Sequence, residues 1–138
     1  MSKTQLRVVL DTNVYISAAL SPQGASGRVW MLGRQRRFQL ITSPFIVNET
    51  GKVLRRLKRG TEQAVTKRLK SIARIAEIIQ PAISLQVVRD PKDNPIIECA
   101  IDGNGDMIVS LDDDLLTLKV YNNIPILHVI DLLHILDE

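Results

Sequence analysis

The sequence has few of the residues that mark disulfide-bonded, membrane-spanning or disordered chains. Its one cysteine, Cys99, excludes an internal disulfide, and seven glycines and six prolines in 138 residues are too few for a low-complexity chain. No apolar run approaches the roughly 20 residues of a membrane span, and the start MSKTQLRVVLD reaches an aspartate too soon for a signal peptide. Because 45% of the residues are hydrophobic, we expect a soluble, cytoplasmic protein with a buried core.

Thiol chemistry and nucleotide-phosphate binding also lack their usual residues. Cys99 lies in the apolar stretch PIIECAI, where a packed thiol is expected, and His128 and His134 both lie near the C-terminal end. No P-loop pattern is present. A calcium loop over DGNGDMIVSLDD is disfavoured, because Met107 stands where the sharp turn needs glycine. These classes of site are therefore not expected.

Charge is divided unevenly along the chain. Residues 1–74 contain 15 Lys and Arg against three acids, a net charge of +12. Residues 75–138 contain three Lys and Arg against 12 acids, a net charge of −9. Such asymmetry is typical of a nucleic-acid partner, or of an acidic site beside a basic surface. Solvated helix faces would give the same counts, so charge alone does not decide between these interpretations.

The apolar pattern predicts strands that alternate with helices. The runs RVVL, MIVSL and IPILHV are apolar without alternation, as in parallel strands buried on both faces. Strands are expected at 6–11, 38–43, 106–111 and 124–129, with 84–88 a short strand or an extended segment. Helices are expected at 13–20, 27–37, 43–60, 61–80, 94–103, 113–123 and 130–138. This order predicts an α/β fold: a three-layer α/β/α sandwich with a central, mostly parallel sheet, in one domain over residues 1–138.

Two of these helices carry clear signals. The helix 43–60 begins with Ser43 as its N-cap and Pro44 at its first position, and Gly60 follows its end. The helix 61–80 ends before Pro81 and has one apolar stripe, formed by Val65, Leu69, Ile72, Ala76 and Ile79. Lys67, Lys70 and Arg74 lie near its opposite side, which makes this side a candidate RNA-binding face.

Several acidic residues are predicted to lie at or near the carboxyl ends of the parallel strands. Asp11 directly follows the first strand, and Asp112 follows the strand MIVSL. Because ligands bind beyond the carboxyl ends of parallel strands, both carboxylates are expected in one crevice. Glu49 flanks the buried stripe of its helix, and Asp93 begins the helix DNPIIECA, so both can join them.

Four neighbouring carboxylates raise one another's pKa values unless a cation neutralises them. Mg²⁺ and Mn²⁺ prefer oxygen ligands, and such an ion polarises a phosphoryl oxygen and lowers the pKa of an attached water. Acids beside a basic surface therefore predict the hydrolysis of a nucleic-acid phosphodiester. Some of the acidic residues also fit simpler roles. Asp112 or Asp114 could be an ordinary helix N-cap, and Asp90, which precedes Pro91, could be a turn residue.

Three segments resemble the motifs of one known family. They are VVLDTNVYISAAL, LITSPFIVNETGKVL and VVRDPKDNPIIECAIDGNGDMIVSLDDDLL, and IPILHVIDLLHIL fits the last strand and helix. In this order and spacing, they resemble a PIN domain, close to the ribonucleases that act as toxins in prokaryotic toxin–antitoxin systems. The resemblance covers nearly the whole chain.

The resemblance implies a fold, an activity and a set of site residues. Metal-binding catalytic acids are implied at Asp11, Glu49, Asp93 and Asp112. Asp114 matches a second acid of the last motif that helps to hold the metal and its water, and Asn13 and Ser110 match supporting polar positions. The family typically cuts single-stranded RNA with Mg²⁺ or Mn²⁺, is commonly a homodimer, and is often silenced by a cognate antitoxin protein.

The sequence departs from the family pattern at the last motif. Leu111 stands where a small residue is more usual, and Asp113 is an extra acid, which we expect to face water. A second hypothesis is therefore a non-catalytic RNA-binding or protein-interaction module that retains the PIN fold. Its candidate surface is the basic stretch KVLRRLKRG…KRLKSIAR, with Arg55, Arg56, Lys67, Lys70 and Arg74.

Overall fold

The computed structural model describes residues 5–58, 60–85 and 93–138. The strands are β1 (Arg7–Leu10), β2 (Gln39–Thr42), β3 (Glu77–Ile78), β4 (Met107–Val109), β5 (Val120–Tyr121) and β6 (Ile124–Leu127). The helices are α1 (Thr12–Leu20), α2 (Ala25–Arg34), α3 (Pro44–Arg56), α4 (Glu62–Ile75), α5 (Asn94–Asp102), α6 (Asp113–Leu118) and α7 (Val129–Ile135). Helices in the described part of the chain are too short or too polar to cross a lipid bilayer.

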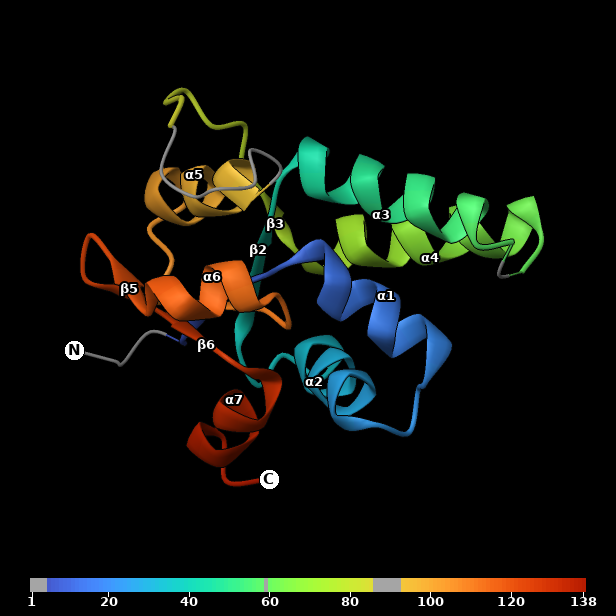
Figure 1. Ribbon diagram of the computed structural model, residues 1–138. Coiled ribbons are helices and arrows are strands. Elements are labelled where there is room, and N and C mark those ends of the chain that lie inside the picture. The colour runs from blue at the N-terminus through green and yellow to red at the C-terminus, as the bar shows by residue number, and fades with distance from the viewer. Residues whose placement is uncertain (1–4, 59, 86–92) are drawn as a thin grey trace.

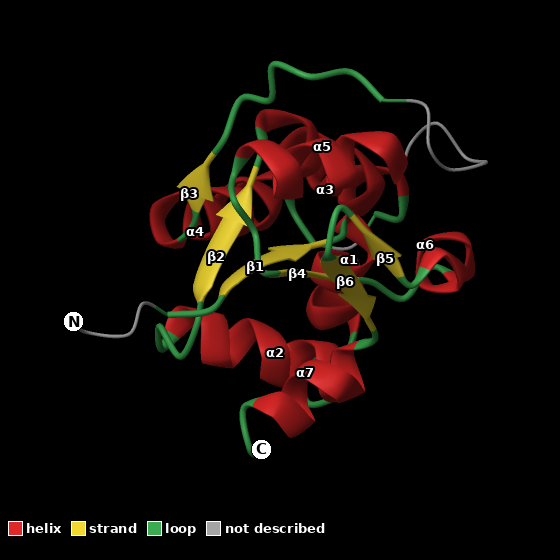
Figure 2. Ribbon diagram, turned by 90° about the vertical axis from the view of Figure 1, so that its left-hand side faces the viewer, coloured by secondary structure: helices red, strands yellow, loops and turns green. Residues whose placement is uncertain are grey.

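The strands form one sheet in the order β3-β2-β1-β4-β6-β5. Every neighbouring pair is parallel except β5 and β6, which are antiparallel. Helix α5 lies over one face of the sheet, and α2 and α7 pack together beneath the other (Figures 1 and 2). The predicted α/β fold with a mostly parallel sheet between helices is therefore confirmed.

The central strands are buried as their apolar runs predicted. In β1, Val8, Val9 and Leu10 are fully buried, and β4 is buried along its whole length. In β6 the burial alternates, with Ile124 and Ile126 buried and Pro125 and Leu127 half-buried, so one face of this strand is only partly covered. Since β1 and β4 are adjacent and parallel, the residues that follow them emerge at the same edge of the sheet.

The start of α3 follows the predicted capping pattern. The Ser43 hydroxyl accepts a hydrogen bond from the Ile46 backbone N–H, and Pro44 occupies the first helical turn. The helix ends at Arg56, and Gly60 lies beyond it with a φ of 94°, a left-handed conformation that favours glycine. The predicted strand or extended segment 84–88 and the predicted turn at Asp90 lie wholly or largely outside the described residues.

Two predicted helix ends are wrong, because residues expected at the ends of these helices form edge strands of the sheet instead. Helix α4 ends at Ile75, and Glu77 and Ile78 pair with β2 as strand β3. Pairing gives β2 a partner on its open side, and the Ile79 N–H donates to the Thr42 carbonyl. The apolar stripe predicted a longer helix because Ile79 still packs against the core after the chain has become extended.

The second correction concerns the helix predicted over 113–123. Helix α6 ends at Leu118, Lys119 adopts a φ of 68°, and Val120 and Tyr121 form β5 against β6. Asn122 and Asn123 make the turn with φ values of 50° and 64°. Two consecutive residues with positive φ are typical of a tight hairpin turn, and asparagine tolerates this conformation, so the sequence did contain this signal.

Candidate metal centre

Asp11 stands at the junction of β1 and α1. Its backbone N–H donates to the Val109 carbonyl at 2.9 Å, which extends the β1–β4 pairing by one residue. Its carbonyl accepts the Val14 N–H, which begins α1. The residue is only 5% exposed, so its carboxylate is held at the carboxyl edge of the central strands and largely out of water.

Ser110 connects Asp11 to Asp112. Its hydroxyl donates to Asp11 Oδ2 at 2.7 Å and accepts the backbone N–H of Asp112 at 2.9 Å. Asp112 Oδ1 in turn accepts the Asp114 backbone N–H at 3.0 Å, so Asp112 is the N-cap of α6. Ser110 is fully buried, and this chain of hydrogen bonds therefore fixes the orientation of two neighbouring carboxylates.

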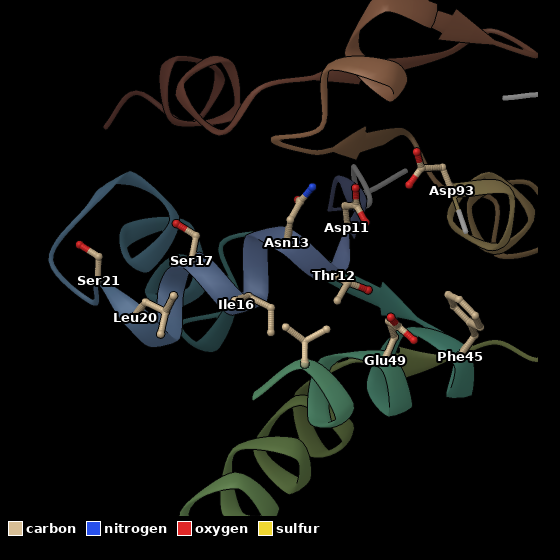
Figure 3. A pocket seen from close by; sticks show the side chains of 11 residues that line it. Asp11, Thr12, Asn13, Ile16, Ser17, Leu20, Ser21, Phe45, Glu49 and Asp93 are labelled. Carbon is tan, nitrogen blue, oxygen red and sulfur yellow. The ribbon is translucent and has the colours of Figure 1, made fainter. Parts of the chain in front are cut away.

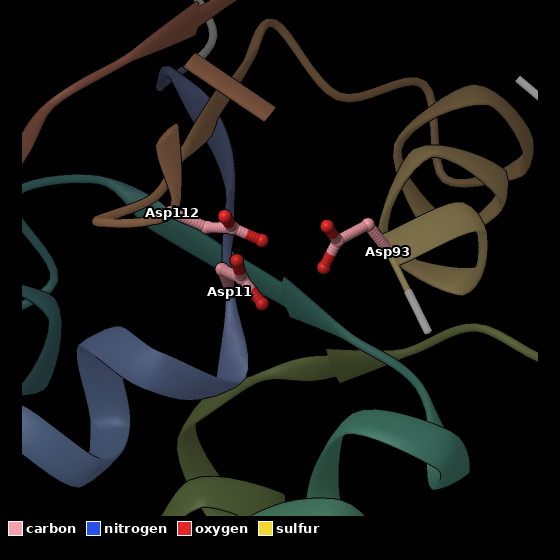
Figure 4. Close-up of side chains that lie close together, drawn as sticks. All are labelled: Asp11, Asp93 and Asp112. Carbon is pink, nitrogen blue, oxygen red and sulfur yellow. The ribbon is translucent and has the colours of Figure 1, made fainter. Parts of the chain in front are cut away.

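Asp93 completes a group of three carboxylates. It lies at the N-terminal end of α5, is 7% exposed, and faces Asp11 and Asp112 from the other side of the crevice (Figure 4). One carboxylate oxygen of each residue lies within 4.8 Å of the others. Three segments that are far apart in the sequence, after β1, before α5 and after β4, thus bring acidic side chains to one point.

The environment of Asp11 disfavours negative charge on its carboxyl group. Burial raises the pKa of Asp11 from 3.8 to about 6, and the charge of Asp112 adds to this increase. The hydrogen bond from Ser110 and that from the Thr12 backbone act in the opposite direction. A divalent cation would remove the cost of charging the group, and three carboxylates are the oxygen ligands that Mg²⁺ and Mn²⁺ prefer. The side chains present therefore fit a metal site.

The sequence profile of the PIN domain family matches residues 7–114, which include all three of these aspartates. The chain belongs to the PIN domain family. Over 126 residues it is 35% identical to the uncharacterized protein MJ1680 of Methanocaldococcus jannaschii, an alignment that covers 88% of this chain and 81% of the relative.

Two solved structures share the PIN fold. The first is the structure of VapBC2 from Rickettsia felis bound to a DNA fragment from its promoter. The comparison gives a TM-score of 0.62 at 15% identity and covers 89% of this chain and 98% of that chain. The second is PAE2754 from Pyrobaculum aerophilum, with a TM-score of 0.65, 16% identity, and coverage of 96% and 90%. At these identities the likeness concerns the fold.

Glu49 lies in the same pocket of the PIN domain as two of the aspartates. The pocket is lined by Asp11, Asp93 and Glu49, and the Glu49 side chain extends into it from α3 (Figure 3). Glu49 is half-buried and does not belong to the group whose oxygens lie within 4.8 Å of one another among the described residues. Its role as a fourth metal ligand remains a prediction.

The polar residues of the first and last motifs hold the loops of the centre in place. Asn13 Oδ1 accepts the backbone N–H of Leu111 at 3.2 Å, which ties the start of α1 to the segment after β4. The Leu111 side chain packs partly against the core, so the departure at this position leaves the aspartates together. Asp113 is exposed, as predicted, while Asp114 is half-buried and its proposed metal role stays a prediction.

The predicted basic residues lie on α3 and α4, outside the pocket that holds the acids. Arg55 forms an ion pair with Glu62 at 3.0 Å, which joins the end of α3 to the start of α4. Lys67, Lys70 and Arg74 are exposed and line a separate hollow of about 390 Å³ along α4. Arg56 is also exposed. We call Lys67, Lys70 and Arg74 the α4 basic face.

Proposed function

We propose that this protein is a divalent-metal-dependent endoribonuclease that hydrolyses phosphodiester bonds of single-stranded RNA. The observation that carries the proposal is the meeting of Asp11, Asp93 and Asp112 at one edge of a PIN-domain sheet. Asp11 and Asp93 are buried, and burial raises the pKa of Asp11, so packing alone does not favour a charged Asp11 carboxylate. Buried acids that share one point are typical of a functional site.

The chain's own residues divide the work of such a site. Asp11, Asp93 and Asp112 would hold Mg²⁺ or Mn²⁺, with Glu49 as a fourth acid at the same pocket. When bound, the ion supplies positive charge for the phosphate and a water molecule of lowered pKa. Ser110 keeps the Asp11 carboxylate in place by donating to Oδ2, and the Asp114 N–H does the same for Asp112. Preset ligands reduce the rearrangement needed when substrate binds.

A cleavage assay with metal titration tests this function. Purified protein is incubated with a labelled single-stranded RNA, a matched RNA duplex, and EDTA, Mg²⁺ or Mn²⁺. We expect cleavage of the single strand in either ion, loss of cleavage in EDTA, and at least about tenfold slower cleavage of the duplex, whose base pairs must first separate. The absence of cleavage with every divalent ion tested would contradict the proposal.

A toxin role and an antitoxin partner are part of the same proposal. They are supported by the resemblance of the motifs to toxin ribonucleases and by the fold shared with VapBC2. The test is the reading frame next to this gene, which should encode a short DNA-binding-type protein. Expression of the ribonuclease alone should arrest growth, and co-expression of that neighbour should restore it. Growth arrest that the neighbour does not relieve would argue against this partner.

The second candidate function is RNA binding without cleavage, and the α4 basic face favours it. The face is exposed and separate from the carboxylates, so it can contact phosphates whether or not the acids are active. Exchanging Lys67, Lys70 and Arg74 for glutamine should weaken binding of single-stranded RNA. It should also make the negative slope of log K against log salt shallower by about two, because each phosphate contact to a single strand contributes roughly 0.7 to its magnitude. Filter binding at several salt concentrations measures both effects.

A matched control removes three exposed charges elsewhere. Exchange of Arg28, Arg34 and Lys119 for glutamine changes the net charge equally but leaves α4 intact. This control should keep most of the salt slope. If both triple variants lose the same slope, the protein binds RNA through its overall charge, and the α4 basic face has no special role. Binding that is unchanged by EDTA, together with no cleavage, would favour the non-catalytic module.

A further inference from the structure

A trough leads away from the carboxylates between helices α1 and α3 (Figure 3). Its volume is about 440 Å³, within the usual range of sites for small ligands. On α3, Phe45, Glu49 and Val53 recur every fourth residue and therefore share one face. On α1, Ile16 and Leu20 line the trough with the same spacing. Apart from Glu49, the side chains in these two rows are apolar.

The other edge of the trough is polar but carries no positive charge. Asn13 and Ser17 on α1 and Ser21 at its C-terminal cap follow one another at the four-residue spacing, beside the apolar row (Figure 3). Among the described residues that line the trough, none is lysine or arginine. A run of phosphates would find no cation here, whereas a neutral flat group would find apolar walls and hydroxyl groups for its polar edge.

Phe45 differs from the other aromatic residues of the protein. All five lie in the described part of the chain, and Phe45 is the exposed one, at 38%. Phe38 and Tyr15 are buried, and Trp30 packs edge-on against Tyr15 with ring centroids 6.1 Å apart. The ring of Phe45 stands at the capped first turn of α3, beside Glu49 and close to the carboxylates (Figure 3). Its backbone is therefore fixed while its ring is accessible.

We propose that this trough is a base-binding subsite and that Phe45 is its stacking residue. The inference rests on the proposed ribonuclease function, since the phosphate at the carboxylates places the neighbouring nucleotide at the trough. One unstacked base next to that phosphate enters between α1 and α3 and stacks on the Phe45 ring. A paired base is stacked on its neighbours and cannot enter, so the subsite also explains a preference for single strands.

A binding experiment tests the stacking without relying on cleavage. The fluorescent base 2-aminopurine is placed at successive positions of a single-stranded oligoribonucleotide, which is bound to the protein with its carboxylates intact and with Ca²⁺ in place of Mg²⁺ to slow cleavage. We expect strong quenching at one position. Quenching should be lost when Phe45→Ala or Phe45→Leu is added and retained with Phe45→Tyr, which keeps the ring. Two variants without a ring guard against loss of folding in one of them, and thermal unfolding checks both.

A kinetic experiment on the protein with intact carboxylates adds a second measure. An RNA with an abasic analogue at the quenched position should show a KM at least about tenfold higher, with kcat within a few-fold. Phe45→Ala should raise the KM of the complete RNA by a similar factor and remove the difference between complete and abasic RNA. The control is Ile130→Ala, an exposed apolar residue on α7, which should change neither value.

The outcomes separate this inference from the ribonuclease proposal. Quenching that depends on the Phe45 ring, without cleavage in any divalent ion, supports the subsite and contradicts the ribonuclease function. Cleavage that is indifferent both to Phe45→Ala and to the abasic analogue overturns the subsite and leaves the ribonuclease function standing. Equal quenching in Phe45→Ala and in the parent protein likewise overturns it.

Discussion

Replacing Asp11 with asparagine is expected to lower kcat for RNA cleavage by at least about a thousandfold, or roughly 4 kcal/mol of transition-state stabilisation. Asparagine has nearly the same shape and can still accept the Ser110 hydroxyl, so the β1–α1 junction should remain intact. What is lost is one of the three negative charges of the carboxylate group, and with it the expected affinity for a divalent cation. Single-turnover cleavage at saturating Mg²⁺ measures the effect.

Asp113→Asn is the matched control for this substitution. Asp113 is the neighbour of Asp112 in the sequence, but it is exposed and lies outside the group of three. The same chemical change at this position should leave kcat within about twofold. Full activity of Asp11→Asn, or equal losses in both variants, would show that the group of three is not the catalytic centre.

The metal-free protein is expected to lose stability as the pH rises from 4 to 7, and Asp11 should account for about 3 kcal/mol of this loss. The folded-state pKa of Asp11, about 6, lies above the value of 3.8 for an unperturbed carboxyl. The folded protein therefore binds more protons than the unfolded chain between these two values. It follows that stability falls as the pH rises through this window and changes no further, as far as Asp11 is concerned, above about pH 7.

Urea unfolding in EDTA at pH 4, 5, 6 and 7 measures this effect, with Asp11→Asn as the reference. The stability of the parent protein should fall below that of Asp11→Asn as the pH rises, because the variant has no carboxylate to charge at this buried position. Saturating Mg²⁺ or Mn²⁺ at pH 7 should restore stability in the parent protein and have little effect on the variant. A stability difference that is independent of pH would refute the assignment of the raised pKa to Asp11.

The two experiments on Asp11 predict opposite effects of its negative charge on activity and on metal-free stability. We expect RNA cleavage to require the negative charge of Asp11, and we expect the same charge to reduce the stability of the metal-free fold. A residue that served only to cap a helix or end a strand would be expected to stabilise the protein in its charged form. The combination of lower activity and higher metal-free stability in Asp11→Asn would therefore distinguish a functional carboxylate from a structural one.

The sequence by itself determined the fold class and all three of the aspartates that meet. The unbroken apolar runs of β1 and β4 predicted parallel strands buried on both faces, and this placed Asp11 and Asp112 at one edge of the sheet. The N-terminal position of Asp93 on α5 was also visible in the sequence. These features depend on local pattern and on chain order, and both can be observed in a single sequence.

Only the tertiary structure decided the end of α4, because Glu77 and Ile78 pair with β2, which is distant in the sequence. It also decided how close Asp93 lies to Asp11 and Asp112, since this distance depends on the packing of α5 against β1 and β4. The trough and the place of Phe45 at its mouth arise where α1 and α3 face each other. Contacts between elements that are far apart along the chain are set by packing, which no local pattern records.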